Sequence, residues 1–340
     1  MSKQYKKIVV GQVGIGKWGK NLLRNFYSLP NVAVKYACDS DSVRLNEFVR
    51  SFPEIKFVTD YESLIQDQEL EAVIIATPAP DHYKVAKRCL EAGKHIFVEK
   101  PITLDVFQAE ELLALAKSVN KKIMVGHLLL YHPAISKLKQ LIGQGELGKI
   151  CYVYTQRLNL GRIRKTENAL WSLAPHDISI ILHLLDKFPK SVSALGSSFV
   201  QKGIEDVAFL NVRFAEGEIG HVHVSWLDPT KTRRTIVVGS KKMAIFDEIS
   251  HGGTLTIIDK GVENISDFKN VSELSKLRSG GDEVIKLSQD EPLSLECQHF
   301  IDSVREGKEP LSNGENALAV LKILAAADRS LKDGGKHELF

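Results

Sequence analysis

Short apolar runs alternate with helical stretches along the first 125 residues of the chain. Six apolar runs predict buried strands, at Ile8–Val13, Val32–Cys38, Lys56–Val58, Ala72–Ala76, His95–Val98 and Lys122–Val125. Four stretches between them predict helices, at Asn21–Tyr27, Val43–Ser51, Tyr83–Glu91 and Val106–Val119. Alternation of helices with nearly continuous apolar strands is typical of a doubly wound parallel sheet. We therefore expect an α/β domain of this class over residues 1–125.

The pattern changes after Gly126. A helix at Ala134–Ile142 precedes an extended run at Ile150–Asn159, and another helix follows His176. Six strand-like runs come next, at Ser191–Leu195, Val207–Phe214, Glu218–Trp226, Thr235–Val238, Met243–Phe246 and Thr254–Ile258. Residues 219–226 alternate apolar and polar with one slip, which suits an antiparallel sheet with one covered face. We expect a second α/β domain over residues 126–340, built on a large, mostly antiparallel open sheet.

The last quarter of the chain adds a polar segment and two helices. Ser266–Glu291 is polar with Gly280-Gly281 at its centre, which predicts a surface loop. Helices at Leu295–Glu306 and Asn316–Leu331 close the chain, and residues 295–331 could pack back on the first domain. So few helices cannot cover both faces of the second sheet, and an uncovered apolar face favours association. We expect a homodimer or homotetramer formed through that sheet.

Charge and cysteine usage narrow the class of protein. The 45 basic and 42 acidic residues give a net charge of +3 without a block of like charges, so we expect neither nucleic acid nor a membrane surface as partner. The four cysteines form no CxxC pair, which favours reduced thiols. Met1–Lys7 lacks an apolar stretch, and no window is long and apolar enough to span a bilayer. These features together predict a cytoplasmic protein without signal peptide or transmembrane segment.

A glycine loop follows the first predicted strand, with the sequence Gly14-Ile15-Gly16-Lys17-Trp18-Gly19. Its first glycine permits a tight turn, its second lets the backbone approach a pyrophosphate, and its third lets helix and strand pack closely. Asp39 ends the second strand about 20 residues further on, where a carboxylate accepts a hydrogen bond from a ribose 2′-hydroxyl. The combination predicts dinucleotide binding and favours NAD over NADP. Arg44 lies nearby and keeps NADP open.

Two further turns carry polar groups at the carboxyl ends of predicted strands. Thr77-Pro78 follows the fourth strand, with His82 at the start of the next helix, and Glu99-Lys100-Pro101 follows the fifth. Ligands bind at this edge of a doubly wound sheet. A charged Glu-Lys pair directly after a buried strand favours a functional role, and an ordinary salt bridge in an exposed turn is the alternative.

With these motifs and Leu170-Trp-Ser-Leu-Ala-Pro-His-Asp177, the chain resembles the glucose–fructose oxidoreductase / inositol dehydrogenase / rhizopine catabolism (Gfo/Idh/MocA) family over essentially its full length. The resemblance implies that NAD is bound by the glycine loop, Asp39, Thr77, Pro78, His82, Glu99 and Lys100. It places Lys100 beside the nicotinamide and the reacting hydroxyl, and His176 on the catalytic histidine. Ser172 stands where many members have a catalytic aspartate, and Ala174 replaces the usual glycine. The resemblance therefore favours a Lys100–His176 pair over a Lys–Asp–His triad.

Within the family, Tyr154–Arg164 and the segment around His176 resemble the dehydrogenases that oxidise the 3-hydroxyl of UDP-N-acetylglucosamine or its uronate. Arginines suit bidentate binding of a diphosphate, and a solvated basic loop is the alternative. Tyr131 could line the cleft, and packing is equally consistent with its position. The expected substrate-binding set is Tyr131, Arg157, Asn159, Arg162, Arg164 and His176.

The expected reaction is NAD-dependent oxidation of a secondary sugar hydroxyl. His176 would accept the hydroxyl proton, since an imidazole ordinarily titrates near pH 6.5, while Lys100 would stabilise the alkoxide and Glu99 would orient Lys100. The two roles could be exchanged, because desolvation lowers the pKa of a lysine. Three alternatives stay open: an inositol or free-sugar dehydrogenase, a keto-sugar reductase, and a non-catalytic NAD-binding regulatory protein. His221 and His223 share a strand face but have no clear third ligand in sequence, so we expect no metal.

Overall fold

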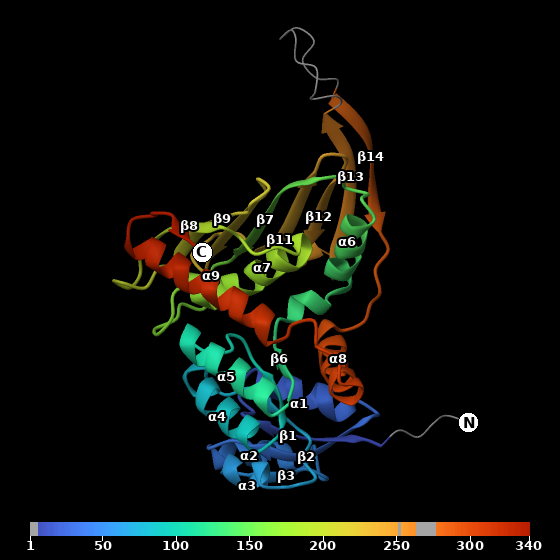
Figure 1. The fold of residues 1–340 in the computed structure, drawn as a ribbon, viewed down its shortest axis with the longest axis vertical. Coiled ribbons are helices and arrows are strands. Elements are labelled where there is room, and N and C mark those ends of the chain that lie inside the picture. The colour runs from blue at the N-terminus through green and yellow to red at the C-terminus, as the bar shows by residue number, and fades with distance from the viewer. Residues whose placement is uncertain (1–5, 251–252, 263–276) are drawn as a thin grey trace, which may run out of the picture. The chain divides into compact units, whose positions relative to one another are not determined.

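The computed structural model describes residues 6–250, 253–262 and 277–340 (Figure 1). Contacts divide the chain into two compact units. The first unit comprises Met1–Tyr131 and Asp290–Leu321, and the second comprises His132–Gln289 and Lys322–Phe340. Each unit is therefore built from two separate stretches of sequence.

The first unit contains a parallel sheet with the strand order β3-β2-β1-β4-β5-β6 in its described part. The strands are β1 (Ile8–Val13), β2 (Val32–Cys38), β3 (Lys56–Val58), β4 (Ala72–Ile75), β5 (His95–Val98) and β6 (Ile123–Val125). Every pairing among them is parallel. The order reverses between β1 and β4, and the crevice outside the carboxyl ends of strands at such a point is where ligands bind. The predicted doubly wound parallel sheet is confirmed.

Helices and caps of the first unit follow local sequence signals. The helices are α1 (Gly19–Ser28), α2 (Ser42–Val49), α3 (Tyr61–Ile65), α4 (Ala79–Glu91), α5 (Val106–Ser118) and α8 (Pro292–Glu306), with the 3₁₀ turn η1 (Leu128–Tyr131). Asp41, Asp60 and Asp105 accept backbone N–H groups at the N-termini of α2, α3 and α5. The five-residue helix α3 was not predicted, because it is too short to show a helical period.

A cluster of three aromatic rings seals α8 into the core of the first unit. Phe26 of α1, Phe97 of β5 and Phe300 of α8 are fully buried. Their ring centroids lie 5.8–6.2 Å apart in edge-to-face arrangements, a favoured geometry for aromatic pairs. The core of this unit therefore includes a helix that comes from the far end of the chain.

The second unit carries a sheet with the order β14-β13-β12-β11-β7-β10-β9-β8-β15 among the described residues. Its strands are β7 (Ile150–Leu158), β8 (Ser191–Ser197), β9 (Val207–Arg213), β10 (Ile219–Ser225), β11 (Thr232–Gly239), β12 (Met243–Asp247), β13 (Thr254–Val262), β14 (Leu277–Ile285) and β15 (Glu338–Leu339). Only β7 and β10 pair in parallel among the described pairings. The expected mostly antiparallel sheet is confirmed. Helices α6 (Pro133–Gly143) and α7 (Ala169–Leu185) belong to this unit, and α9 (Gly314–Lys332) runs across the boundary between the two.

One expectation for this sheet was wrong. Leu277–Ile285 forms strand β14 and pairs antiparallel with β13, although the polar segment Ser266–Glu291 predicted a loop. Residues 263–276 of that segment lie outside the described residues. Pairing with a neighbouring strand decides the structure here, because a strand with exposed residues needs no apolar alternation.

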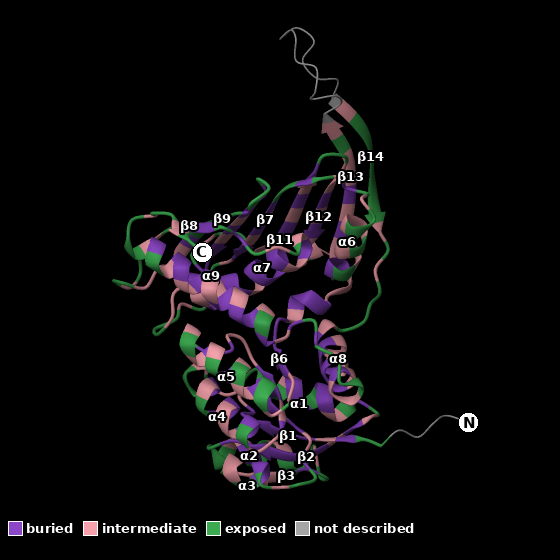
Figure 2. Ribbon diagram, viewed as in Figure 1, coloured by how far each residue is buried: buried purple, intermediate pink, exposed green. Residues whose placement is uncertain are grey.

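One face of the second sheet is covered and the other is exposed. In β9, Ala208, Leu210 and Val212 are buried, and the intervening Phe209, Asn211 and Arg213 are exposed (Figure 2). Helix α7 packs on the covered face. Alternation of this kind is what a sheet with one solvent-facing side requires.

None of the helices in the described residues is both long enough and apolar enough to span a membrane. All four cysteines lie within those ranges and are free thiols. Cys38, Cys89 and Cys297 are buried, while Cys151 is exposed.

Candidate active site

The glycine loop between β1 and α1 is shaped by close backbone packing. Gly14 has a φ of +91°, and a Cβ there would lie 2.6 Å from the carbonyl carbon and oxygen of Ala76. A Cβ at Gly19 would lie 2.3 Å from the Gly14 oxygen, whereas one at Gly16 would meet nothing within 4 Å. The buried Gln12 side chain donates to the carbonyl oxygens of Gly14 (2.9 Å) and Gly19 (2.7 Å). The Gln12 side chain thus fixes the loop, and Gly16 leaves the loop backbone accessible to a ligand.

The N-terminus of α1 fits an anion. The helix has ten residues, and its N-cap, Trp18, makes no side-chain hydrogen bond to the first turn. The first turn of a helix has N–H groups without partners inside the helix and the positive end of the dipole. Together with the open backbone at Gly16, these groups fit the pyrophosphate of a dinucleotide.

Asp39 at the end of β2 is fixed by several donors. Its buried carboxylate accepts from the backbone N–H groups of Ile15 (2.9 Å) and Asp41 (3.1 Å) and from Arg44 Nη1 (2.8 Å). Burial alone would raise the pKa of Asp39, but these donors outweigh burial and hold the pKa below its ordinary value. Arg44 also contacts Asp41 (3.3 Å), so two carboxylates face one guanidinium. The two negative charges of Asp39 and Asp41 outweigh the single positive charge of Arg44, which suits a ribose hydroxyl better than a phosphate.

The imidazole of His82 ties the turn after β4 to the turn after β5. Nδ1 lies 2.7 Å from the carbonyl oxygen of Pro101, and Nε2 lies 2.9 Å from that of Thr77. The ring is buried, and burial lowers the pKa of His82 although both carbonyls oppose the shift. Pro78 is the N-cap of α4, so the Thr77-Pro78 turn is fixed by the helix as well.

Glu99 connects the turn after β5 to the glycine loop. Its carboxylate accepts from Trp18 Nε1 (2.6 Å) and from the backbone N–H of Lys100 (3.2 Å). A Cβ at residue 126 would lie only 2.9 Å from Glu99 Oε1, so glycine at this position leaves room for the carboxylate. Burial raises the pKa of Glu99 to about 7, against the opposing effects of Trp18 and Lys100. Lys100 is half-buried beside this carboxylate.

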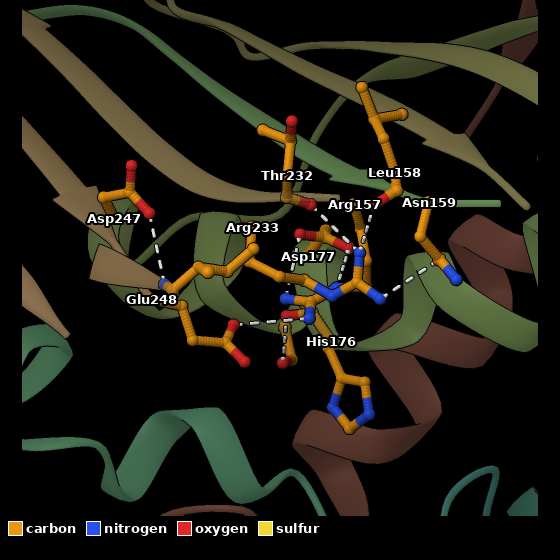
Figure 3. Close-up of polar contacts among 11 residues, drawn as sticks. Arg157, Leu158, Asn159, His176, Asp177, Thr232, Arg233, Asp247 and Glu248 are labelled. Atoms are coloured by element: carbon orange, nitrogen blue, oxygen red, sulfur yellow. Dashed lines mark hydrogen bonds and ion pairs between the residues drawn. The ribbon is translucent and has the colours of Figure 1, made fainter. Parts of the chain in front are cut away.

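His176 lies on α7 in the second unit and is half-buried. Asn168 caps the helix by accepting from the backbone N–H of Trp171 (3.0 Å). Ser172 is buried one turn before His176. In Figure 3 the His176 ring points away from a cluster of charged side chains formed by Arg157, Asp177, Arg233 and Glu248.

Arg157 occupies the centre of that cluster. It lies on β7 and is 8% exposed. Its Nε donates to Asp177 Oδ2 (2.9 Å), one terminal nitrogen lies 3.4 Å from Asp177 Oδ1, and the other lies 3.4 Å from Glu248 Oε2. Burial alone would lower the pKa of Arg157, but the two carboxylates outweigh burial and raise it. Arg157 was expected to hold a diphosphate, and these contacts instead engage all three of its nitrogens.

The remaining expected substrate residues, Asn159, Arg162 and Arg164, follow the end of β7 within the second unit. Asn159 directly follows β7, and its Oδ1 accepts from Arg233 Nη2 (3.3 Å). Arg162 and Arg164 are exposed, and Arg164 Nε lies 3.5 Å from Glu167 Oε1.

Tyr131 belongs to the interior of the first unit. Its hydroxyl lies 2.9 Å from Ser312 Oγ and accepts from the Ser312 N–H (3.3 Å), and its ring centroid lies 5.2 Å from that of His299. These contacts favour the packing alternative for this residue.

Two charged residues of the cluster were not anticipated from the sequence. Arg233 of β11 lies directly opposite Arg157 in the β7–β11 ladder, and Glu248 follows β12. Arg233 donates through Nη1 to the carbonyl oxygens of Leu158 (2.8 Å) and Thr232 (2.9 Å). Burial and the Arg157 charge lower the pKa of Arg233. Two arginines in opposing positions repel each other unless carboxylates lie nearby. The sequence alone does not show that Arg157 and Arg233 are opposite each other, because this depends on the register of β7 and β11.

The two histidines considered as metal ligands have ordinary contacts. His221 Nδ1 lies 2.7 Å from Asn211 Oδ1, and His223 stacks on Phe209 with ring centroids 4.3 Å apart. Among the described residues, no group of three or more His, Cys, Asp or Glu side chains could hold a metal ion.

Comparison with known proteins decides the family. Residues 8–127 match the model "Oxidoreductase family, NAD-binding Rossmann fold", and residues 135–245 match "GFO/IDH/MocA C-terminal domain". The chain belongs to the Gfo/Idh/MocA oxidoreductase family. Its first unit is accordingly the NAD-binding Rossmann domain of that family, in agreement with the glycine loop, the uncapped α1 and Asp39.

Relatives of this Gfo/Idh/MocA oxidoreductase act on several polyols and sugars. The scyllo-inositol 2-dehydrogenase (NAD(+)) of Bacillus subtilis (strain 168) is 26% identical over 95% of this chain and 93% of its own. The UDP-N-acetylglucosamine 3-dehydrogenase of Acidithiobacillus ferrooxidans (strain ATCC 23270) is 25% identical over 93% of this chain and 94% of its own. The crystal structure of GenD2 from gentamicin A biosynthesis, in complex with NAD, superposes with a TM-score of 0.83 at 22% identity, over all of this chain and 98% of that one.

We predict that NAD binds more tightly than NADP, because Asp39 accepts a ribose hydroxyl and repels a 2′-phosphate. Asp39→Ser should weaken NAD binding and narrow the difference between the two cofactors. Titration calorimetry with NAD and with NADP measures both affinities. Tighter binding of NADP to the wild type would mean that Arg44, rather than Asp39, determines the preference.

Proposed function

We propose that this Gfo/Idh/MocA oxidoreductase oxidises the 3-hydroxyl of a nucleotide sugar of the UDP-N-acetylglucosamine type. The gathering of arginines at the end of β7 carries the proposal. Arg162 and Arg164 follow that strand, and Arg233 donates to Leu158 and Asn159 at its end. Guanidinium groups bind diphosphates through paired hydrogen bonds. The relative that acts on UDP-N-acetylglucosamine supports the same substrate class.

The residues of the chain would divide the chemistry as follows. The glycine loop and Asp39 would hold NAD, which would supply the hydride acceptor for the carbon that carries the hydroxyl. His176 accepts the hydroxyl proton, and Lys100 donates a hydrogen bond to the same oxygen as negative charge develops on it. Glu99 fixes the backbone of Lys100 through its N–H and keeps that turn against Trp18. Ser172 cannot replace an aspartate as a base, which leaves Lys100 and His176 as the acid–base pair.

A free-polyol dehydrogenase is the second candidate. The scyllo-inositol dehydrogenase relative aligns over nearly the whole chain, at an identity similar to that of the nucleotide-sugar enzyme. In this alternative Arg162 and Arg164 are solvated surface residues with no role in substrate binding. Comparison of free and nucleotide-linked substrates separates the two candidates.

We predict that Lys100→Met and His176→Asn each lower kcat by about 10²–10⁴-fold, the usual loss when one acid–base group is removed. The Kd for NAD should change little, because the glycine loop and Asp39 are untouched. NADH absorbance in steady state measures turnover, and calorimetry measures NAD binding. Wild-type kcat/KM should rise with pH as the base loses its proton, and His176→Asn should flatten that rise.

Lys117→Met, at an exposed position on α5, is the matched control for the lysine and should retain full activity. Wild-type turnover by either active-site variant would remove that residue from the proposed pair.

We predict that UDP-N-acetylglucosamine is used with a far higher kcat/KM than free N-acetylglucosamine or scyllo-inositol. One charge-assisted hydrogen bond contributes about 1.5–3 kcal/mol, or roughly 10–150-fold in affinity. At least one of Arg162→Ala, Arg164→Ala and Arg233→Ala should therefore raise KM for the UDP-sugar by that order. Turnover of a panel of UDP-, dTDP- and free sugars provides the measurement.

Arg234→Ala is the control for the arginines, because Arg234 is next to Arg233 on β11 but pairs with Asp247 (2.9 Å) and is half exposed. It should leave kcat/KM unchanged. Equal kcat/KM for free and UDP-linked sugars would reject the nucleotide-sugar proposal in favour of the free-polyol candidate.

We also propose that the exposed face of the second sheet joins two or four copies of the chain. Leu195, Phe209 and His223 lie opposite one another on β8, β9 and β10, and the first two are 59% and 40% exposed. Tyr152 and Ile219 form a parallel row with 41% and 38% exposure. Apolar rows of this kind on a flat sheet face favour a closed symmetric assembly.

We expect light scattering at micromolar concentration to give two or four times the 37.9 kDa mass of the chain. Phe209→Glu should shift the protein towards the monomer, because it places a charge in the centre of the apolar row. Phe107→Glu, at an exposed position on α5 of the first unit, should have no effect. A stable wild-type monomer would contradict the proposed assembly.

A further inference from the structure

Helix α7 lacks part of its own backbone support next to His176. Pro175 lies inside the helix, directly before His176. A proline has no N–H, so it cannot donate to the carbonyl of Trp171 one turn earlier, and its ring crowds that carbonyl. The turn that carries His176 therefore needs another source of rigidity. Ser179 Oγ donates to the His176 carbonyl oxygen (2.7 Å) and supplies one such contact on the following turn.

Asp177 supplies a much stronger connection. Its side chain is 1% exposed, and Arg157 of β7 contacts both carboxylate oxygens, at 2.9 Å through Nε and 3.4 Å through a terminal nitrogen. Strand β7 lies inside the sheet, between β10 and β11. The contact therefore fastens α7 to one of the most firmly held strands of the second unit, in a paired geometry that fixes orientation as well as distance.

The far side of Arg157 is fastened too. Its remaining terminal nitrogen lies 3.4 Å from Glu248 Oε2, and the backbone N–H of Glu248 donates to the carbonyl oxygen of Arg233 (2.9 Å). Arg157 is thus held between a residue on the helix and a residue after β12. Figure 3 shows the chain of contacts from Glu248 through Arg157 to Asp177, with His176 beside it.

Fixing Asp177 fixes the direction of His176. Consecutive residues of an α-helix point about 100° apart around its axis, since a turn holds 3.6 residues. A helix turn held at Asp177 resists rotation about the helix axis, so the Cα–Cβ bond of His176 keeps its direction relative to the sheet. Figure 3 shows the Asp177 side chain directed to Arg157 and the His176 ring directed away from the cluster.

We infer that Arg157 and Asp177 are positioning residues for His176, with Glu248 holding Arg157 in place. The inference rests on the proposed function, in which His176 accepts the hydroxyl proton. Stability alone is a poor reason for this pair, because a buried ion pair often stabilises a fold no more than apolar side chains of the same size. Catalysis supplies a better reason, because a displacement of the order of 1 Å at the reacting atoms can cost roughly 10²-fold in rate.

The test replaces the pair by apolar side chains of similar size. The double variant Arg157→Met/Asp177→Leu leaves no buried charge of the pair unpaired, so it should fold, and its melting temperature and NAD affinity should stay near those of the wild type. Its kcat, per NAD-binding site and with the best sugar of the panel, should fall about 10–100-fold through loss of positioning, while KM changes less than threefold. Asp177→Asn alone should lower kcat in the same direction.

Combination with His176→Asn identifies the route of the effect. If the pair acts through His176, adding Arg157→Met/Asp177→Leu to His176→Asn should cause little further loss of kcat. Full additivity of the two losses, or wild-type kcat in the double variant, would overturn the positioning role and leave the role of His176 intact. Wild-type kcat in His176→Asn alone would overturn the proposed function and the positioning role with it.

Arg234→Met/Asp247→Leu is the matched control, since this ion pair lies on the same sheet but is more exposed. It should leave kcat and KM unchanged. A loss of melting temperature in the Arg157 and Asp177 variants without loss of kcat per NAD-binding site would show a purely structural pair and reject the inference.

Discussion

The approach of Gly14 to the Ala76–Thr77 peptide is the constraint on which the cofactor edge of the first unit depends. A side chain at residue 14 would overlap the Ala76 carbonyl, so β1 and β4 meet there through backbone atoms alone. Hydrogen bonds link this peptide to the turn after β5 and back to the glycine loop. His82 joins Thr77 to Pro101, Glu99 joins that turn to Trp18, and Trp18 returns to the glycine loop. Hydrogen bonds therefore connect the turns after three strands to one another.

These contacts show that the side chains of Glu99 and His82 form hydrogen bonds within the protein. Glu99 is engaged by Trp18 and by a backbone N–H, and both ring nitrogens of His82 face carbonyl oxygens. These contacts connect the Glu99-Lys100 backbone with Trp18 of the glycine loop and with the turn after β4. In the proposed reaction they would preorganise Lys100.

Much of the fold could be predicted from local sequence, and the exceptions have physical causes. Period and apolar content identified the parallel strands of the first unit, because β1, β4, β5 and β6 are almost entirely buried. Strand β14 was missed because its residues are exposed and pairing with β13 alone holds it in the sheet. The motif positions Asp39, Glu99 and His176 were found by spacing and resemblance. The ion-pair partners of Arg157, which are Asp177 and Glu248, were not predicted, and neither was Arg233 opposite it. These residues come together only through the register of β7 and β11 and the packing of α7.

The two-part construction of the first unit has a consequence for how the protein is made. The edge of β6 is completed by residues near position 312: the Val125 N–H donates to the Ser312 carbonyl oxygen (2.8 Å), and Ser312 Oγ donates to the Val125 carbonyl oxygen (2.7 Å). Phe300 fills the core between Phe26 and Phe97. A ribosome therefore releases the glycine loop and all six strands of the Rossmann sheet well before it adds the helix that closes their core. Until then the nascent chain exposes Phe26, Phe97 and the β6 edge. Residues 132–289, which form most of the second unit, are synthesised before the cofactor domain can reach its final packing.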